Sequence, residues 1–254
     1  MPQIPSKNGN SYHRLEANWH ATLGVVQDLV DRFRTWRWSH LFVANLRILL
    51  GFAFLPAGLK KVLYQPFTDP QNTGVFHDFL HAFYATGAFY QFVGVVQLVI
   101  AVLLMTQAYA TLGALLALPV ISSITVFCWS TGVVPTAIVT TLMLCANLLL
   151  VVWDVDRWMP ILRRADRPSR GGRKVAAQPT QPPIDLSLWR ACGAAILVVY
   201  GLACLAYGGV YRPRSLDLGE PAFYVLPVIA LIPVVTLILE QRHRTREACN
   251  GPEQ

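Results

Sequence analysis

Six apolar stretches of about twenty residues, separated by short polar segments, constrain this chain more than any other feature. A helix needs about 20 apolar residues to cross the hydrocarbon core of a bilayer. In a soluble α/β protein, turn residues would interrupt such runs roughly every five to eight positions. Only 14% of the residues are charged, whereas soluble domains carry about a quarter. The sequence therefore predicts an all-α, multi-pass membrane protein.

The expected transmembrane helices form a group of four and a group of two. The link between the second and third spans, around Gln107 and Tyr109, is so short that these helices should form an antiparallel hairpin. An Arg- and Pro-rich segment follows the fourth span and cannot bury a core. In chain order, the expected spans cover residues 41–59, 89–106, 108–128, 134–153, 189–211 and 222–240. The expected units are an N-terminal segment (1–40), a four-helix membrane domain (41–158), a basic linker (159–188), a C-terminal pair of membrane helices (189–240) and a tail (241–254).

Within the N-terminal segment, residues 1–16 are polar and are expected to be disordered. From Asn18 to Trp36, apolar residues recur every three or four positions, which is typical of an amphipathic helix. We expect this helix to lie at the membrane surface. The alternative is a helix that packs on the cytoplasmic face of a partner protein.

The distribution of Lys and Arg predicts the orientation of the chain. Five of them precede the first span, eight lie between the end of the fourth span and the start of the fifth with Arg190 included, and three follow the sixth. These three regions share one side of a six-span protein, and the opposite side carries four. Because cytoplasmic loops are enriched in Lys and Arg, both termini are expected in the cytoplasm. The same enrichment accounts for the net charge of +7. Nucleic acid is not an expected partner, since no basic stripe is interleaved with aromatic residues.

Arg47 and Asn147 are the polar residues that most invite a functional interpretation. Each lies about six residues into its span from the same surface, which places it roughly 9 Å deep. A charged side chain at that depth normally faces the bundle interior and finds a partner. We therefore predict that Arg47 faces the four-helix core near Asn147, with Asp154 as its counter-charge. The alternative is that Arg47 extends to the cytoplasmic headgroups as a topology anchor.

Gln97, near the middle of the second span, is either a ligand contact or an interhelical hydrogen-bonding residue. Lys60 and Lys61 end the first span, where cations suit headgroup phosphates and the negative end of the helix. Pro56 interrupts the same span and leaves a backbone carbonyl free to meet a ligand, water or a neighbouring side chain.

A short aromatic helix is expected around Phe76–Tyr84, resting on the outer leaflet. Within it, His77 and His81 share one face at a spacing that can bind a metal, but no third ligand is evident. They are weak candidates, and no metal site is predicted. The five cysteines form no CxxC pair, which argues against a thiol–disulfide enzyme. There is no phosphate-binding loop, nucleophile elbow or paired-carboxylate constellation, so the sequence specifies no catalytic residues.

Three segments in order, with matching hydrophobic spacing, resemble the DoxX family of small bacterial membrane proteins. They are RILLGFAFLPAGLKKVLYQPF at 47–67, FYQFVGVVQLVIAVLLM at 89–105 and LMLCANLLLVVWDVDRW at 142–158. The early Arg of the family corresponds to Arg47. Its Gly–x–Lys motif corresponds to Gly58 and Lys60, and its Gly–x–x–Glu/Gln motif to Gly94 and Gln97. The resemblance covers about 110 residues, less than half of the chain.

The resemblance implies a compact four-helix bundle in a bacterial cytoplasmic (inner) membrane. Relatives include the membrane subunit of thiosulfate–quinone oxidoreductase and a partner in a thiol-stress oxidoreductase complex. This chain departs from the family at Gln97, which is often acidic in relatives, and in its N-terminal helix, basic linker and last two spans. Because Gln97 is neutral, no proton-handling role is predicted for it.

The sequence supports three candidate functions. The first is an accessory or quinone-interacting subunit of a membrane redox system, whose interior pocket would use Arg47, Gln97 and Asn147 as polar contacts. The second is a scaffold or assembly factor that binds a cytoplasmic partner or anionic lipid. The third is a small-molecule transporter, which the lack of an inverted repeat disfavours. Membrane lipid is an expected partner in every case. The sequence does not indicate the oligomeric state.

Overall fold

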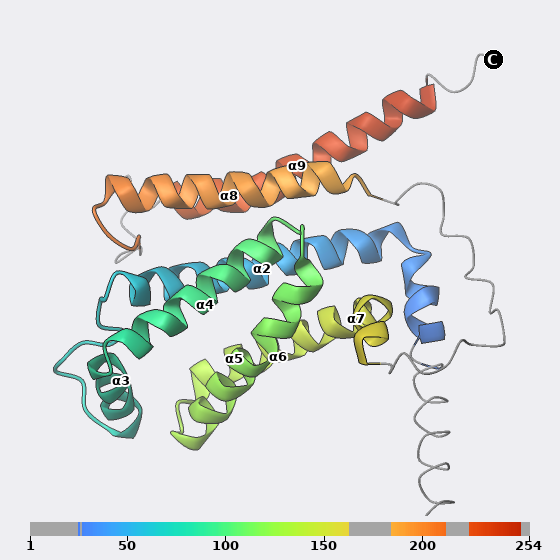
Figure 1. Ribbon diagram of the computed structural model, residues 1–254. Helices are drawn as coiled ribbons and strands as arrows, with labels where there is room; N and C mark the ends of the chain where they lie inside the picture. Colours follow the sequence, from blue (N-terminus) through green and yellow to red (C-terminus); the bar gives the residue numbers. More distant parts are fainter. Residues whose placement is uncertain (1–24, 26, 163–183, 212–223, 250–254) are drawn as a thin grey trace, which may run out of the picture.

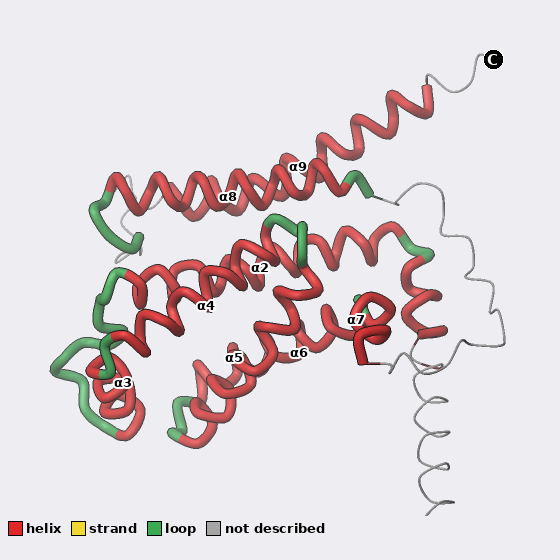
Figure 2. The backbone as a smooth tube through the Cα atoms, in the orientation of Figure 1, coloured by secondary structure: helices red, strands yellow, loops and turns green. Residues whose placement is uncertain are grey.

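The computed structural model describes residue 25 and residues 27–162, 184–211 and 224–249. Its regular elements within these ranges are all helices (Figure 2). Six of them are long and apolar enough to cross a membrane, as the sequence predicts. These six are α2 (Arg37–Val62), α4 (Ala88–Met105), α5 (Ala110–Ser130), α6 (Val134–Trp153), α8 (Leu186–Ala206) and α9 (Val225–Cys249). Two shorter helices are α3 (Val75–Ala85) and α7 (Val155–Leu162). The protein is an all-α, multi-pass membrane bundle.

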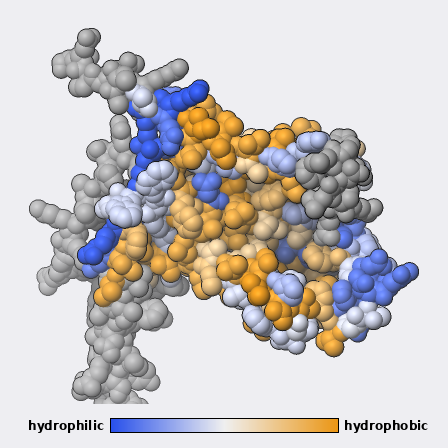
Figure 3. Space-filling view, turned by 180° about the vertical axis from the view of Figure 1, so that it is seen from behind, coloured by the Kyte–Doolittle hydropathy of each residue, from blue (hydrophilic) through white to orange (hydrophobic). Residues whose placement is uncertain are grey.

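The six long helices form three antiparallel pairs. Helix α2 packs most extensively on α4, α5 on α6, and α8 on α9 (Figure 1). Helix α2 begins at Arg37, and the same end of the bundle holds the last turn of α6, the start of α8 and Glu240 of α9. We call this the Arg37 end and the opposite one the Val62 end. Both ends are hydrophilic in places, and a broad apolar surface lies between them (Figure 3). That surface faces lipid in a membrane.

Glycines allow α2 and α4 to approach each other closely. A Cβ on Gly94 would lie 2.6 Å from the Cβ of Lys61 and 2.9 Å from the carbonyl oxygen of Gly58. Neither position has room for a side chain, because backbone atoms of the facing helix occupy the space. Small residues allow membrane helices to gain van der Waals contact in this way. Gly58 and Gly94, the glycines of the two family-motif matches, are therefore packing residues between the first two spans.

Several expected boundaries differ from those in the structure. The fifth span begins earlier, at Leu186, and ends at Ala206, and α9 continues beyond residue 240 to Cys249. Residues 241–249 contain neither Gly nor Pro, so nothing in their sequence stops the helix. The expected linker begins as helix α7. Outside the described residues lie positions 1–24 and 26, which include the first part of the expected amphipathic helix, together with most of the linker, the first residues of the sixth span and the end of the tail.

The C-terminal pair is joined to the four-helix bundle by a few close contacts. Gly193 of α8 lies against the last residue of α4, Met105, so that a Cβ on Gly193 would be 1.8 Å from the Met105 carbonyl oxygen. Farther along α8, the ring of Tyr200 meets Phe52 of α2 edge-on, with centroids 5.6 Å apart. Gly193 sets how close α8 comes to the bundle, because a backbone carbonyl cannot move aside as a flexible side chain can.

Gly193→Ala should lower the free energy of unfolding by about 1–3 kcal/mol, since the added methyl group forces α8 away from α4. Thermal unfolding of the purified protein in mild detergent would measure the change. Gly201→Ala, on the same helix, is the matched control, because its Cβ would meet no atom within 4 Å. Equal stability of the two variants would show that α8 does not pack on Met105.

Asp185 caps the N-terminus of α8 and gives a second prediction. Its carboxylate accepts hydrogen bonds from the Ser187 hydroxyl and from the backbone N–H groups of Ser187 and Leu188. The bond from the Ser187 hydroxyl is the main reason why the pKa of Asp185 lies below its ordinary value of 3.8. The stabilisation by the charged cap is complete above the ordinary pKa. It is lost as the pH falls through the lowered folded-state value.

Asp185→Ala should therefore cost about 1 kcal/mol at neutral pH, whereas Asp185→Asn, which keeps a capping oxygen, should cost much less. Unfolding temperatures of the native protein and Asp185→Asn, compared between neutral and acidic pH, should converge on acidification. A difference that grows as the pH falls would contradict the capping role.

Candidate functional site

Arg47 and Asp154 form a buried ion pair at the Arg37 end. Nη2 of Arg47 lies 2.7 Å from Oδ2 of Asp154, and Arg47 is only 6% exposed. The same carboxylate oxygen accepts a hydrogen bond from the Thr111 hydroxyl at 3.0 Å, and Arg157 lies 3.4 Å from the other oxygen. The prediction that Asp154 is the counter-charge of Arg47 is confirmed. The guanidinium is held by α6 inside the bundle and is not extended to the headgroups.

The local sequence explains this geometry. Asp154 is the C-cap residue of α6, so its side chain leaves the helix where the chain turns into α7. Arg47 is long enough to reach it from a position ten residues into α2. Because unpaired charge is expensive in the membrane, the pairing ties the first span to the end of the fourth. Thr111, at the start of the third span, donates a hydrogen bond to the same carboxylate.

Asn147 does not join this ion pair. Its Nδ2 donates to the carbonyl oxygen of Ala114 at 3.1 Å, which fastens α6 to α5. Its Oδ1, like Nε of Arg47, is buried with no hydrogen-bond partner among the described residues. The expected core-facing orientation of Arg47 is confirmed by its burial, but its partner is Asp154, and Asn147 is instead hydrogen-bonded to α5. Asn147 is fully buried and serves as an interhelical hydrogen-bond donor.

Gln97 is partnered by Lys61 near the Val62 end. Nζ of Lys61 donates to Oε1 of Gln97 at 3.0 Å and to the Ala57 carbonyl at 3.3 Å. The ammonium also lies 4.6 Å from the ring centroid of Phe67, and Lys61 is only 7% exposed. The expectation that Lys61 contacts lipid headgroups is wrong, because its side chain turns into the bundle beside α4. Lys60, half-buried next to it, donates to the Phe67 carbonyl at 3.5 Å.

The four candidate residues of the interior polar site therefore do not form one site. Arg47 and Lys61 are fourteen residues apart on α2, which is about 21 Å along the helix axis. One of them pairs with Asp154 and the other with Gln97. Each cation has its own polar partner within the bundle, so both pairs act first as contacts between helices.

His77 and His81 hydrogen-bond with the loop before α3. Nδ1 of His77 is 2.7 Å from the Thr68 hydroxyl, and Nε2 of His81 is 3.2 Å from the Asn72 carbonyl. The described residues contain no group of three His, Cys, Asp or Glu side chains that could hold a metal. The aromatic side chains of α3 do not all point to lipid, because Phe79 packs on Phe127 of α5 at 4.4 Å between centroids.

Glu240 was not identified from the sequence, although its side chain is only 1% exposed. Oε2 accepts a hydrogen bond from the indole N–H of Trp189 at 2.8 Å, and Oε1 lies 3.4 Å from Arg37 and 3.5 Å from Arg244. The cluster joins α8, α9 and the start of α2. The sequence feature that could have identified Glu240 is an acidic residue at the end of an apolar run, because a carboxylate at that depth requires hydrogen-bond donors.

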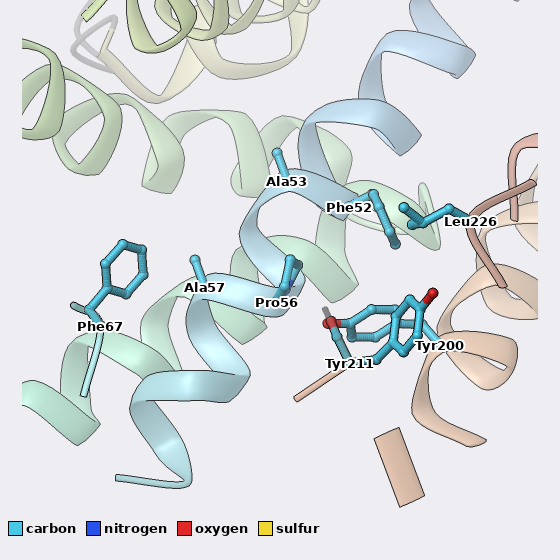
Figure 4. A pocket seen from close by; sticks show the side chains of 8 residues that line it. All are labelled: Phe52, Ala53, Pro56, Ala57, Phe67, Tyr200, Tyr211 and Leu226. Atoms are coloured by element: carbon cyan, nitrogen blue, oxygen red, sulfur yellow. The ribbon is translucent and has the colours of Figure 1, made fainter. Parts of the chain in front are cut away.

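An apolar cavity of about 320 Å³ lies between α2 and the C-terminal pair (Figure 4). Its walls are mainly aromatic and aliphatic, and none of the predicted polar site residues lines it. Four of its lining residues belong to α2, and the others come from the loop after α2 and from the C-terminal pair. They are Phe52, Ala53, Pro56, Ala57, Phe67, Tyr200, Tyr211 and Leu226. No prediction placed a cavity here, because it arises only from how α8 and α9 meet α2.

Comparisons with known protein families, with curated proteins and with solved structures find no match to this chain. The DoxX resemblance of residues 47–158 therefore stays a prediction that rests on the sequence motifs.

Arg47→Leu should lower the free energy of unfolding by about 3–5 kcal/mol, because it leaves the Asp154 carboxylate buried without its closest cation. Arg157→Leu is the matched control. Its side chain is mostly exposed, so its loss should cost about 1 kcal/mol or less. Unfolding in detergent at neutral pH would measure both. Replacing Arg47 and Asp154 together by Leu should restore part of the stability, and a further loss in the double variant would contradict the pairing.

Proposed function

We propose that this protein is an accessory subunit of a membrane redox system that binds an isoprenoid quinone in the cavity between α2 and the C-terminal pair. The observation that carries the proposal is the cavity itself, with its volume of about 320 Å³ and its aromatic walls. Ligand pockets of small apolar molecules begin at about 300 Å³ and are lined mainly by hydrophobic side chains. A substituted quinone ring fits this description.

The wall of the cavity offers aromatic surfaces for the ring. Phe52 and Tyr200 meet edge-on on one side, and Tyr211 lies beside Tyr200 with ring centroids 6.4 Å apart. Phe67, from the loop after α2, also lines the cavity and lies to one side of these rings (Figure 4). Stacked and edge-on contacts with such rings stabilise a flat aromatic ligand. The cavity lies at a seam between helices in the membrane, which is where a lipid-soluble ligand travels.

The cavity also has a source of polar contact. Pro56 has no N–H, so the carbonyl of Phe52 lacks the donor of the residue four positions later in the helix. Both residues line the cavity. A quinol hydroxyl can donate to such a carbonyl, whereas the oxidised quinone cannot, because it has only acceptors. We therefore propose that this carbonyl faces the cavity and favours the reduced form of the ligand.

Transport is less well supported than ligand binding. Arg47 and Lys61 pair with neighbouring side chains, and Phe54, midway between them on α2, is buried. The buried core of the bundle, which includes Phe54, holds large apolar side chains of the other three helices, and this disfavours a polar route for a solute. Among them are Ile100, Leu104, Ile121 and Leu150.

The location in the cell is part of the same proposal. We place the chain in a bacterial inner membrane, with the Arg37 end in the cytoplasm. The excess of Lys and Arg in the segments attached to that end supports this orientation. The contact of Arg37 with Glu240 supports a common side for the start of the first span and the end of the sixth.

Quinone should copurify with the protein, and filling the cavity should remove it. We expect Ala57→Leu to reduce the bound quinone at least tenfold, because the larger side chain occupies the cavity. The measurement is organic extraction and mass spectrometry of protein purified gently in detergent. Ala195→Leu, the same exchange at an exposed position of α8, is the matched control and should leave the quinone content unchanged.

Phospholipid alone in the extract of the native protein would contradict quinone binding. Together with one recurring copurified protein, that result would favour the second candidate, a membrane scaffold. The feature that favours a scaffold is the exposed, basic end of α9 beyond Glu240, which extends away from the bundle (Figure 1).

A further inference from the structure

The helix before α2, residues 27–34, is fastened across the Arg37 end of the bundle; we call it the surface helix. Nε2 of Gln27 donates to Asp156 at 3.0 Å. Arg34 contacts both the Asp156 carboxylate and the Trp153 carbonyl oxygen. Val30, between them, is buried. One face of the surface helix is therefore bound to the junction of α6 and α7. In Figure 1 it runs across the direction of α2.

A second face of this segment is apolar and exposed. Leu29 is 54% exposed, and Phe33 is similarly exposed. Val25, just before the helix, and Trp36, just after it and 67% exposed, are exposed too. Their spacings of four, four and three residues place them on one side of a helix. These side chains have no partner in the described part of the chain that would cover them.

The third face is polar. Asp28, Asp31 and Arg32 are exposed there. With about 100° of rotation per residue, the apolar, bound and polar faces follow one another around the helix axis. A helix that lies at a membrane surface needs this arrangement, with lipid on one side, the protein body on the next and water on the third.

The apolar face is also continuous with the lipid-facing surface of the first span. Trp38, Phe42 and Leu49 of α2 are all exposed, and they follow Trp36 along the chain. Tryptophan is favoured where hydrocarbon meets headgroups. The bilayer that surrounds α2 therefore extends up to the level of the surface helix.

From these observations we infer that the surface helix docks on the lipid leaflet at the Arg37 end, with its Leu29 and Phe33 face inserted between headgroups and acyl chains. The partner is the lipid surface, and not a second protein. Arg34 then holds the docked helix on the end of α6, next to the carboxylate that pairs with Arg47. This inference does not depend on quinone binding.

Photo-crosslinking in nanodiscs of phosphatidylethanolamine and phosphatidylglycerol tests the inference on the full-length chain. Leu29 is replaced by benzoylphenylalanine in one variant and Asp31 in another. After irradiation, mass spectrometry should find lipid adducts at position 29 at least tenfold more abundant than at position 31. Leu142, exposed in the middle of α6, is the positive control for contact with lipid.

Adducts at position 142 with none at position 29 would overturn the inference. A crosslink from position 29 to a second copy of the chain would overturn it too, since the apolar face would then be a protein interface. Phe33, replaced in the same way, gives an independent reading and should behave as Leu29 does. If the Leu29 variant fails to fold, the result at position 33 decides the question by itself.

Discussion

The pairing of Arg47 with Asp154 is the interaction on which the arrangement of the first four spans depends. A guanidinium within a transmembrane helix must find an anion or lose much of the stability of the fold. Here the anion lies where α6 ends, and Thr111 at the start of α5 contacts the same carboxylate. Three spans thus meet at one group of atoms. The pair also sets the register of α2 against α6, because neither helix can slide along its axis without separating the charges.

The remaining contacts divide the molecule into a bundle and an attached pair of helices. Within the bundle, Gly58 and Gly94 bring α2 and α4 together, and Lys61 and Gln97 join the same helices at the Val62 end. The C-terminal pair meets the bundle at Gly193, at Tyr200 against Phe52, and at Glu240 against Arg37. Between these close contacts and the loop after α2, the facing surfaces do not fill the space, and the apolar cavity remains. The proposed ligand site thus exists because the C-terminal pair contacts the bundle at only a few places. The polar pairs hold in position the helices that border this site.

The sequence predicted some of these contacts and missed others for identifiable reasons. Asp154 could be chosen as the partner of Arg47 because few anions lie at a matching depth. Lys61 could not be assigned in the same way. Its place at the end of a span suits headgroups, and only the rotation of α2 against α4 turns it toward Gln97. Glu240 was overlooked because its partners, Trp189 and Arg37, are distant in the chain. The cavity could not be predicted, because its walls come from segments that are far apart in the chain. No local sequence pattern shows how such segments pack against one another.

The sequence by itself determined that this chain is an all-α membrane protein with six spans. It also located most of the described span boundaries to within a few residues. Both properties follow from local quantities, namely the length of apolar runs and the position of charged residues along them. Only the tertiary structure decided which side chains face one another and where space remains between helices. Those properties depend on helix rotation, tilt and close approach, which arise from the packing of all spans together. The separation of Arg47 from Gln97 into two pairs, and the cavity beside Phe52 and Tyr200, are both results of that packing.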